Sequence, residues 1–485
     1  MNLTVGKKGE VRVVPVVTDQ VPKGLEELYQ YLKEKEIFRG ARGEIFSDIG
    51  YRGSNAILVG LGEEAEVDSE KLKLAFYKAG KALAKARITE ATVELPRFSG
   101  LCYRRTAMAA AEGLMNSAYA FDKYVTSEKK NSVLTEVGFL VEKGKEEKIS
   151  QALTEIGNIM KGVELTRDLV NEPAEVIYPE TLAKAAKEAL EPLGVEVEIL
   201  GRDEIGALGM TAFLAVARGS AREPRLIVMR YKGGSEGEEV LGLVGKGLTY
   251  DSGGYALKTP AGMATMHIDM GGGGAVIGAM AALAANKVER NVTAVVAACE
   301  NMISGDSFKN GDIIPTMSGK TIEVGNTDAE GRVTLADSIY YTATRENAAE
   351  IIDVATLTGA AVVALGTHYT AAITNDQAMA DDVLKAARMA GEKVWQLPAD
   401  DEFRDMVKGK RADLLNSVKG GAGTITAGMF LEHFTDGKKW VHLDIAGTVA
   451  GDAPKGYRPA GATGIPVKTL YYYCKGDLDS KHSLV

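Results

Sequence analysis

The sequence predicts an α/β protein with two domains, and three observations support this fold class. Strand-like and helix-like segments alternate along almost the whole chain, as they do in sheets covered by helices. One helical segment in the first third is much longer than its neighbours and ends at a proline, so it divides the alternating pattern in two. The chain of 485 residues is also longer than a single hydrophobic core usually supports.

The first domain is predicted at residues 1–150 as a small α/β unit. Its expected strands are 10–17, 55–62, 90–96 and 136–143, and its expected helices are 24–36 and 68–86. No cluster of acids, bases or metal ligands stands out in this region.

Residues 146–173 keep a helical period until Pro173, and residues 151–172 are predicted as a helix that connects the domains. The second domain, residues 173–485, alternates strands and helices again. Its expected strands are 195–200, 224–233, 239–247, 292–300, 350–359 and 439–447. This order predicts a mixed, mostly parallel sheet with helices on both faces, whose ligands bind beyond the carboxyl ends of the strands.

Composition narrows the class of protein. The chain has 57 Lys and Arg against 66 Asp and Glu, a net charge of −9, which does not favour a nucleic-acid partner. Three well-separated cysteines argue against a disulfide framework and for the cytoplasm. We expect no signal peptide at the N-terminus and no membrane span, because no run of 18 apolar residues is present. Glycine makes up 55 of the 485 residues, which indicates tight backbone turns.

A charged cluster lies in the segment GNTDAEGRVTLAD, residues 325–337. Asp328, Glu330 and Arg332 are spaced by two residues, so in an extended segment they share one face. Gly331 would let the backbone approach a neighbour closely.

A second cluster lies in residues 243–276. A buried strand is expected to end at Lys246, and Asp251 follows in a glycine-rich turn. Lys258 comes next, and Asp269 stands just before the glycines that open a helix of small residues.

Together the two segments supply four carboxylates near expected strand ends. Four carboxylates cannot all stay ionised at close range without cations, and two divalent metals would remove that cost. Lys246 could bind a metal only as a neutral amine. Lys258 and Arg332 would stay charged and could stabilise an oxyanion.

Simpler interpretations exist for each residue alone. A single Asp in a glycine-rich loop is more often a turn residue than a ligand, and a single lysine is more often solvated or paired. Other catalytic motifs are incomplete: there is no P-loop, no G-x-G-x-x-G, no H-E-x-x-H and no G-x-S-x-G. The joint pattern therefore leaves a metal or anion site as one hypothesis beside these simpler ones.

Several longer motifs are similar to those of one known family. NTDAEGR and VGKGLTYDSGG resemble the leucyl aminopeptidase family, the cytosolic two-metal exopeptidases also called M17 peptidases. The resemblance continues in TRDLVNEPAEVIYPE, ENMISGDSFKNGDII, DVATLTGAAVVALG, GGAGTITAGMFLEHF and WVHLDIAGT, so it covers about residues 160–470. It also implies that the small N-terminal α/β domain is macro-like.

The resemblance implies a set of site residues. Asp251 and Glu330 would each contact both of two metals, Lys246 and Asp269 would complete one metal site, and Asp328 the other. Lys258 and Arg332 would be catalytic. The metals would be Zn²⁺ or Mn²⁺, and Arg332 would hold a bicarbonate with help from the backbone at Gly331 and Leu357. Peptide substrates with a first residue like leucine would bind in an apolar pocket. Its candidate residues are Met266, Thr356, Leu357 and Gly359.

The resemblance further implies a homohexamer and a role in peptide turnover. The chain departs from the family pattern at His267, Gly273, Gly274, Ile303, Asn310 and Val333, of which Ile303 and Asn310 replace prolines. These changes leave the expected ligands intact. Three alternatives stay open: a two-metal hydrolase for another amide such as a Cys-Gly dipeptide, a DNA-binding protein like some relatives, and an inactive scaffold.

Overall fold

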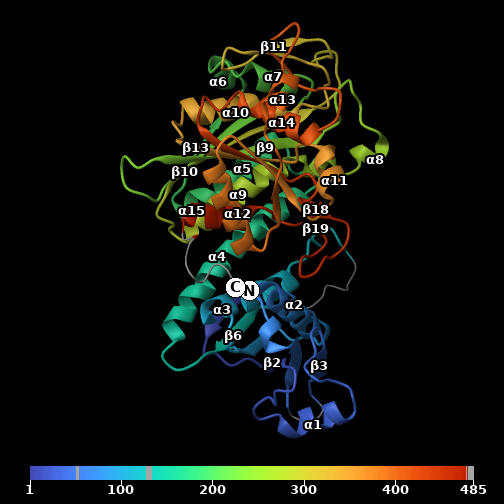
Figure 1. Cartoon of the computed structure of the whole chain (residues 1–485), viewed down its shortest axis with the longest axis vertical. Helices are drawn as coiled ribbons and strands as arrows, with labels where there is room; N and C mark the ends of the chain where they lie inside the picture. Colours follow the sequence, from blue (N-terminus) through green and yellow to red (C-terminus); the bar gives the residue numbers. More distant parts are fainter. Residues whose placement is uncertain (51–53, 127–133, 477, 479–485) are drawn as a thin grey trace. The chain divides into compact units, whose positions relative to one another are not determined.

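The computed structural model describes residues 1–50, 54–126, 134–476 and 478, and these form two compact units. The first contains Met1–Met160 and Asp452–Ala460, and the second contains Lys161–Gly451 and Gly461–Leu478 (Figure 1). The chain passes between them inside α4 (Glu146–Asn171), within the long helical segment that the sequence predicts.

The first unit is built on a six-stranded sheet with the order β1-β6-β5-β2-β4-β3. Every neighbouring pair is parallel except β3 and β4. The strands are β1 (Asn2–Val5), β2 (Val11–Val17), β3 (Ile45–Asp48), β4 (Ala56–Gly62), β5 (Glu90–Glu94) and β6 (Glu136–Leu140). The helices are α1 (Glu26–Glu34), α2 (Ser69–Lys85), α3 (Tyr103–Ala118) and a short 3₁₀ helix (Glu64–Glu66).

The core of this unit follows from the two-residue period of its strands. Val14 and Val16 of β2 point to the same face, and there they pack against Tyr29 and Leu32 of α1. The periodicity of the sequence did not reveal α3, because most of the 16 residues of this helix are buried and it therefore has no polar stripe. The periodicity also did not reveal β1 and β3, which are four-residue strands at the two edges of the sheet.

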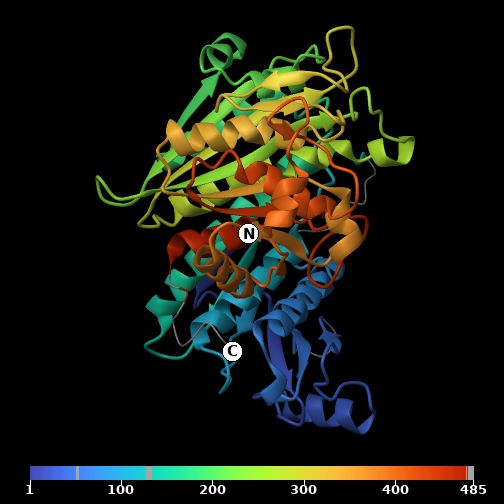
Figure 2. The same cartoon turned by 45° about the horizontal axis from the view of Figure 1, so that its top comes forward.

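The second unit contains an eight-stranded sheet with the order β15-β14-β17-β13-β9-β10-β8-β7 (Figure 2). The central strands β17, β13, β9 and β10 are parallel to their neighbours in that group, and antiparallel pairs join β8, β7 and β14 to them. The strands are β7 (Glu196–Leu200), β8 (Arg225–Lys232), β9 (Val240–Asp251), β10 (Asn291–Asn301), β13 (Glu350–Ala355), β14 (Thr370–Thr374), β15 (Val394–Gln396) and β17 (Lys439–Asp444).

Short strands complete the β-structure of this unit. They are β11 (Ile313–Pro315), β12 (Thr321–Glu323), β16 (Leu414–Leu415), β18 (Ala450–Gly451) and β19 (Gly461–Ala462). The predicted mixed sheet flanked by helices is confirmed, but the predicted strands omitted β14, β15 and all of these short strands.

Helices cover both faces of the eight-stranded sheet. One layer contains α5, α9, α12 and α15, and the opposite layer contains α7, α10, α11 and α14 (Figure 1). The helices are α5 (Pro179–Leu190), α6 (Arg202–Ala207), α7 (Thr211–Ala217), α8 (Pro260–Met263), α9 (Gly271–Ala285), α10 (Gly331–Thr344), α11 (Gly359–Leu365), α12 (Gln377–Ala390), α13 (Asp401–Met406), α14 (Gly423–Glu432) and α15 (Val467–Lys475), with 3₁₀ helices at Glu191–Leu193 and Met266–Met270.

The glycine-rich start of α9 lies directly against the sheet. A Cβ atom on Gly272 would lie 2.0 Å from the carbonyl oxygen of Val354 in β13, so only glycine permits this approach. The contact brings Asp269, just before α9, to the carboxyl ends of β9 and β13.

One helical segment of the described residues, Met266–Ala285, is long and apolar enough to cross a membrane by length and composition. It is 83% buried inside the fold, which accounts for its apolar composition, since a core helix is hydrophobic on all sides.

Candidate metal centre

Strand β9 carries two of the expected ligands. The expectation that the strand ends at Lys246 is wrong, because β9 continues to Asp251 and keeps pairing with β10 as far as Asn301. Lys246 therefore points from inside the strand, where its side chain is only 3% exposed, and Asp251 is the last strand residue. Both still face the carboxyl end of the sheet, where ligands of such folds bind.

The segment of Asp328 and Glu330 is not extended, so the two-residue alternation predicted for it is wrong. Asp328 lies in a turn, Glu330 immediately precedes α10, and Arg332 lies in the first turn of that helix. The two carboxylates converge because the chain turns between them and enters a helix, not because they share a strand face.

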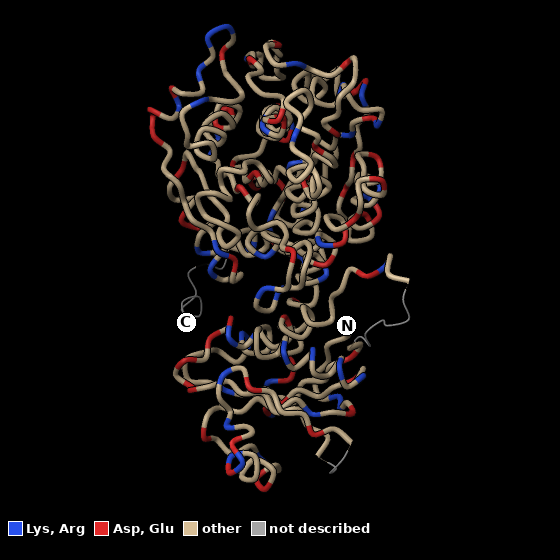
Figure 3. The backbone as a smooth tube through the Cα atoms, turned by 90° about the vertical axis from the view of Figure 1, so that its right-hand side faces the viewer, with Lys and Arg blue, Asp and Glu red and all other residues tan. Residues whose placement is uncertain are grey.

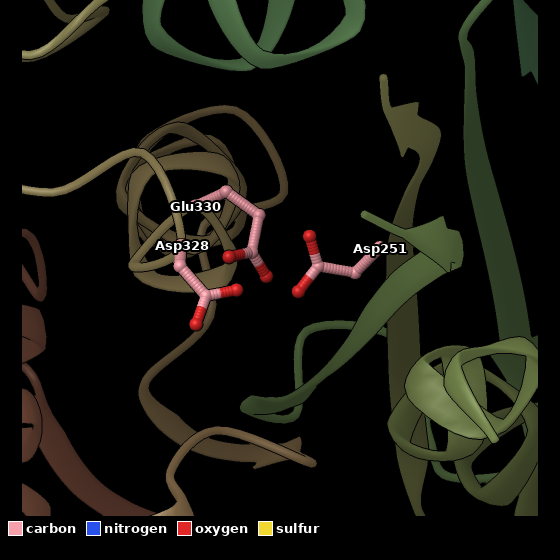
Figure 4. A group of neighbouring side chains, drawn as sticks. All are labelled: Asp251, Asp328 and Glu330. Carbon is pink, nitrogen blue, oxygen red and sulfur yellow. The ribbon is translucent and has the colours of Figure 1, made fainter. Parts of the chain in front are cut away.

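Three carboxylates meet at one point of the structure (Figure 4). Asp251, Asp328 and Glu330 each place one oxygen so that all three oxygens lie within 4.8 Å of one another. Asp251 comes from β9, and the other two come from the segment leading into α10. Asp269 is not in this group of three but lies beside it, since Lys246 bridges Asp269 and Glu330.

Two lysines neutralise part of this charge. The Nζ atom of Lys246 lies 2.8 Å from Asp269 and 2.9 Å from Glu330, and it donates to the carbonyl oxygen of Thr356 at 3.0 Å. Lys258 reaches the group from the loop after β9, where its Nζ lies 2.8 Å from Asp251 and also forms an ion pair with Asp328.

Burial and mutual repulsion raise the pKa of several carboxyl groups. Burial, followed by the charge of Asp251, raises the pKa of Glu330 to about 8. Burial also raises the pKa of Asp269 to about 6, although Lys246 opposes the shift. The pKa of Asp328 is raised for the same reason, with its Lys258 contact acting in the opposite direction. Ionising all four carboxylates is therefore costly with only two lysines as partners.

The pKa values of the two lysines are also raised, which favours their charged form. Burial alone would lower the pKa of Lys246, but Asp269 and Glu330 outweigh it and hold the pKa above its ordinary value. Burial likewise acts against Lys258, whose pKa is raised by its carboxylate neighbours. Arg332 is different: burial lowers its pKa to about 10.

The residues present fit divalent cations. Carboxylate oxygens are preferred ligands of hard divalent metals, and the four carboxylates outnumber the two lysines that pair with them. The Oε2 atom of Glu330 is buried without a hydrogen-bond partner among the described residues, so it is an acceptor that a cation would satisfy. Because the carboxylates raise the pKa of Lys246, its use as a ligand requires the release of a proton.

Gly331 explains how Lys246 reaches this cluster. A Cβ atom at position 331 would lie 2.5 Å from Cε and 2.7 Å from Nζ of Lys246. A side chain on the first residue of α10 would therefore displace the end of Lys246, so Gly331 has a structural role beside the predicted contact with an anion.

The predicted substrate residues have defined surroundings. Thr356 donates from Oγ1 to Oδ1 of Asp269 at 2.7 Å, so its hydroxyl supports a proposed ligand. The N–H group of Leu357, predicted to assist an anion, donates to Asp444 at 3.1 Å. Met266 is half-buried at the start of its 3₁₀ helix. Gly359 has no atom within 4 Å of where its Cβ would lie, so space is open beside it.

Sequence reasoning missed three polar residues that support the cluster. Asp444 ends β17 and accepts hydrogen bonds from Leu357 and, at 2.7 Å, from Thr358. Asn301 ends β10 and donates to Asp251 at 2.8 Å. Their positions at strand ends were a usable signal. No such signal was present for Asn416, because the strand before it, β16, has only two residues and shows no periodic pattern.

The fold and the site together define a metal-dependent enzyme built on an α/β sheet. Comparison with known proteins agrees. Residues 164–471 match the family model described as the cytosol aminopeptidase family, catalytic domain, and residues 5–128 match the N-terminal domain of the same family. The chain belongs to the cytosol aminopeptidase (M17) family, which confirms the resemblance seen in its motifs.

Relatives and solved structures match over nearly the full chain. A protein of Clostridium tetani described as a probable cytosol aminopeptidase is 49% identical over 477 residues, 98% of this chain and 99% of the relative. A protein of Treponema denticola with the same description is 47% identical over 474 residues, 97% of this chain and 99% of the relative.

Two solved structures share the fold. The bottromycin maturation enzyme BotP in complex with Mn has a TM-score of 0.87 at 30% identity, covering 96% of this chain and 99% of that one. A mutant of tomato leucine aminopeptidase has a TM-score of 0.86 at 33% identity, and the match covers 98% of this chain and 96% of the tomato enzyme. The chain is thus a metal-dependent aminopeptidase that acts at the N-terminus of peptides.

Proposed function

We propose that this aminopeptidase removes leucine and similar apolar residues from the N-terminus of peptides, using two divalent cations per subunit. The observation that carries the proposal is the convergence of Asp251, Asp328 and Glu330 within 4.8 Å. The proposed metal ligands are Lys246, Asp251, Asp269, Asp328 and Glu330. Zn²⁺ and Mn²⁺ are the proposed ions, and the manganese of the BotP complex supports the second of these.

When bound, two such cations supply a site for a neutral α-amine, Lewis-acid polarisation of the peptide carbonyl and a water of lowered pKa. The protein's own residues then have separate tasks. Without bound cations, the pKa of Lys258 is raised by its carboxylate neighbours. Its side chain keeps 17% exposure, and its proposed task is to donate to the oxygen of the substrate carbonyl. Donors aimed at that oxygen stabilise the charge that develops on it.

Arg332 is the proposed holder of a bicarbonate that acts as general base. Its Nη1 donates to the carbonyl oxygen of Asn416 at 2.8 Å, which fixes the guanidinium. Its buried Nε has no hydrogen-bond partner among the described residues, so one donor is available to an anion. Arg332 would hold the bicarbonate through this donor, and a bicarbonate held there would supply a general base.

The preference for an apolar first residue is supported by the family resemblance, and the proposed pocket residues are Met266, Thr356, Leu357 and Gly359, of which Gly359 is exposed at the start of α11. The test is turnover of leucine, methionine, alanine, lysine and glutamate anilides, with N-acetyl-leucine anilide as the blocked control. We expect leucine and methionine to be cleaved fastest and the acetylated substrate to be inert. A protein that cleaves Cys-Gly but no anilide would establish the alternative amide substrate.

We further propose a cytoplasmic homohexamer that does not bind nucleic acid. The names of the relatives support the location, and the family resemblance supports the oligomer. Acidic and basic residues intermingle along the chain without a long basic stretch, which argues against a nucleic-acid surface (Figure 3). Light scattering tests the hexamer, and a gel shift at low salt tests DNA binding.

A further inference from the structure

The segment that carries Asp328 is held by amide side chains. We call residues 325–329 the ligand loop. It has no strand partner of its own, yet the N–H groups of residues 325–328 all donate to asparagine side chains. An asparagine amide offers both a donor and an acceptor, like a peptide group, so it can replace a neighbouring strand.

Asn416 accepts two of these four bonds and is fully buried. Its Oδ1 accepts from Gly325 at 2.7 Å and from Asn326 at 3.2 Å. Its Nδ2 donates to the carbonyl oxygens of Asn326 at 2.8 Å and Ala329 at 3.2 Å. The short pairing of β16 with β12 ends at Leu415, so the Asn416 side chain continues that sheet where the backbone ladder stops.

Two further asparagines hold the middle of the ligand loop. Asn310 accepts from the N–H of Thr327 at 3.0 Å, and it stands where the resemblance places a proline. Asn301 donates to the carbonyl oxygen of Thr327 at 3.0 Å and also to Asp251 at 2.8 Å. The ligand loop is therefore fixed from both ends and from its centre before any ligand binds.

We infer that Asn416, assisted by Asn310, is a positioning residue that sets the affinity of the centre for divalent cations. The inference rests on the proposed metal ligands. A carboxylate on a loop ordered in advance binds a cation without a further ordering cost, whereas a loosened loop must be ordered by the cation itself. Removing the amide should thus weaken metal binding more than it changes turnover at saturating metal.

The test measures Mn²⁺ binding by calorimetry to chelator-treated full-length protein, together with activity as a function of Mn²⁺ concentration. The variants are Asn416→Ala and Asn310→Ala. Asn310 is exposed and makes one bond to the ligand loop, so its variant keeps the test open if Asn416→Ala does not fold. The control is Asn375→Ala, which removes an amide that bonds to Trp440 and Lys438 away from the ligand loop.

For Asn416→Ala we expect a dissociation constant about 10- to 100-fold higher, as for other supports of metal ligands, and recovery of turnover at saturating Mn²⁺. For Asn310→Ala we expect the dissociation constant for Mn²⁺ to rise about 2- to 10-fold, which is the effect of losing one hydrogen bond. Folded Asn416→Ala and Asn310→Ala proteins that bind Mn²⁺ as tightly as the wild type would overturn the inference. An equal loss of Mn²⁺ affinity in the control Asn375→Ala would overturn it as well. A wild type that binds neither Mn²⁺ nor Zn²⁺ would instead overturn the proposed function, and the inference with it.

Discussion

Replacing Thr356 by valine removes one hydroxyl group beside a proposed metal ligand while preserving the shape of the side chain. The Thr356 hydroxyl donates to Oδ1 of Asp269 at 2.7 Å, and both residues are buried. The backbone carbonyl of Thr356, which accepts from Lys246, is unchanged by the substitution. The same hydroxyl lies 3.0 Å from the backbone carbonyl oxygen of Asp269, so the variant removes all the support that this hydroxyl gives to one residue, Asp269.

The expected loss of Mn²⁺ affinity can be estimated from this hydrogen bond. A hydrogen bond to a charged group contributes about 1.5–3 kcal/mol, and each 1.4 kcal/mol is about tenfold in an equilibrium constant. If the hydroxyl orients Asp269 for a cation, the Mn²⁺ affinity of Thr356→Val should fall by about 10- to 100-fold. The effect should be larger on metal affinity than on the unfolding temperature.

The assay is calorimetric titration of Mn²⁺ into chelator-treated protein. The matched control is Thr342→Val, since Thr342 is also buried but donates to the carbonyl oxygen of Ser338 within α10 at 2.8 Å. A Thr356→Val protein with an Mn²⁺ affinity within about twofold of wild type would refute the reasoning, because the lost bond would then not bear on the cation.

Other substitutions test other parts of the account. Gly331→Ala places a Cβ 2.5 Å from Cε of Lys246, so kcat/KM should collapse; an active variant would show that the lysine need not pass there. Lys258→Gln should lower kcat about 10²- to 10³-fold while Mn²⁺ binds as tightly or more tightly, because an ammonium no longer competes for the carboxylates; calorimetry with kinetics checks both. Burial alone would lower the pKa of His442, but Asp353 raises it above 6.5, so this pair stabilises the fold below pH 6.5 and the contribution is lost as pH rises through the raised pKa. The unfolding temperature, measured from pH 6.5 upward, should fall with pH in the wild type as this contribution is lost, and should not show this fall in His442→Gln. The same pH dependence of the unfolding temperature in both proteins would contradict the prediction.

Much of the fold could be predicted because its elements are strongly periodic. The central strands β9, β10, β13 and β17 appear in the sequence as apolar runs, and α2 shows a clear apolar stripe. Elements without such a pattern were missed. Helix α3 is buried on most sides, and the edge strands are too short for a period to register.

The candidate site, like the fold, could be predicted from the sequence only in part. The residue types of the cluster could be picked out from the sequence, because several carboxylates at close range favour a bound cation. Their local geometry was not, since the conformation of residues 325–332 is set by distant amides such as Asn416, 84 residues from Arg332 in sequence. The roles of Thr356 and of Asp444 also depend on contacts between segments far apart in the chain.

The most direct test of the central claim is hydrolysis of leucine anilide by chelator-treated protein, with Mn²⁺ or Zn²⁺ added back, for wild type and Asp251→Asn. The asparagine keeps the size of the side chain but removes the charge that meets Asp328 and Glu330. The account predicts metal-dependent release of the anilide by wild type and none by the variant. Equal activity of the two proteins, or no activity of a folded wild type with metal bound, would contradict it.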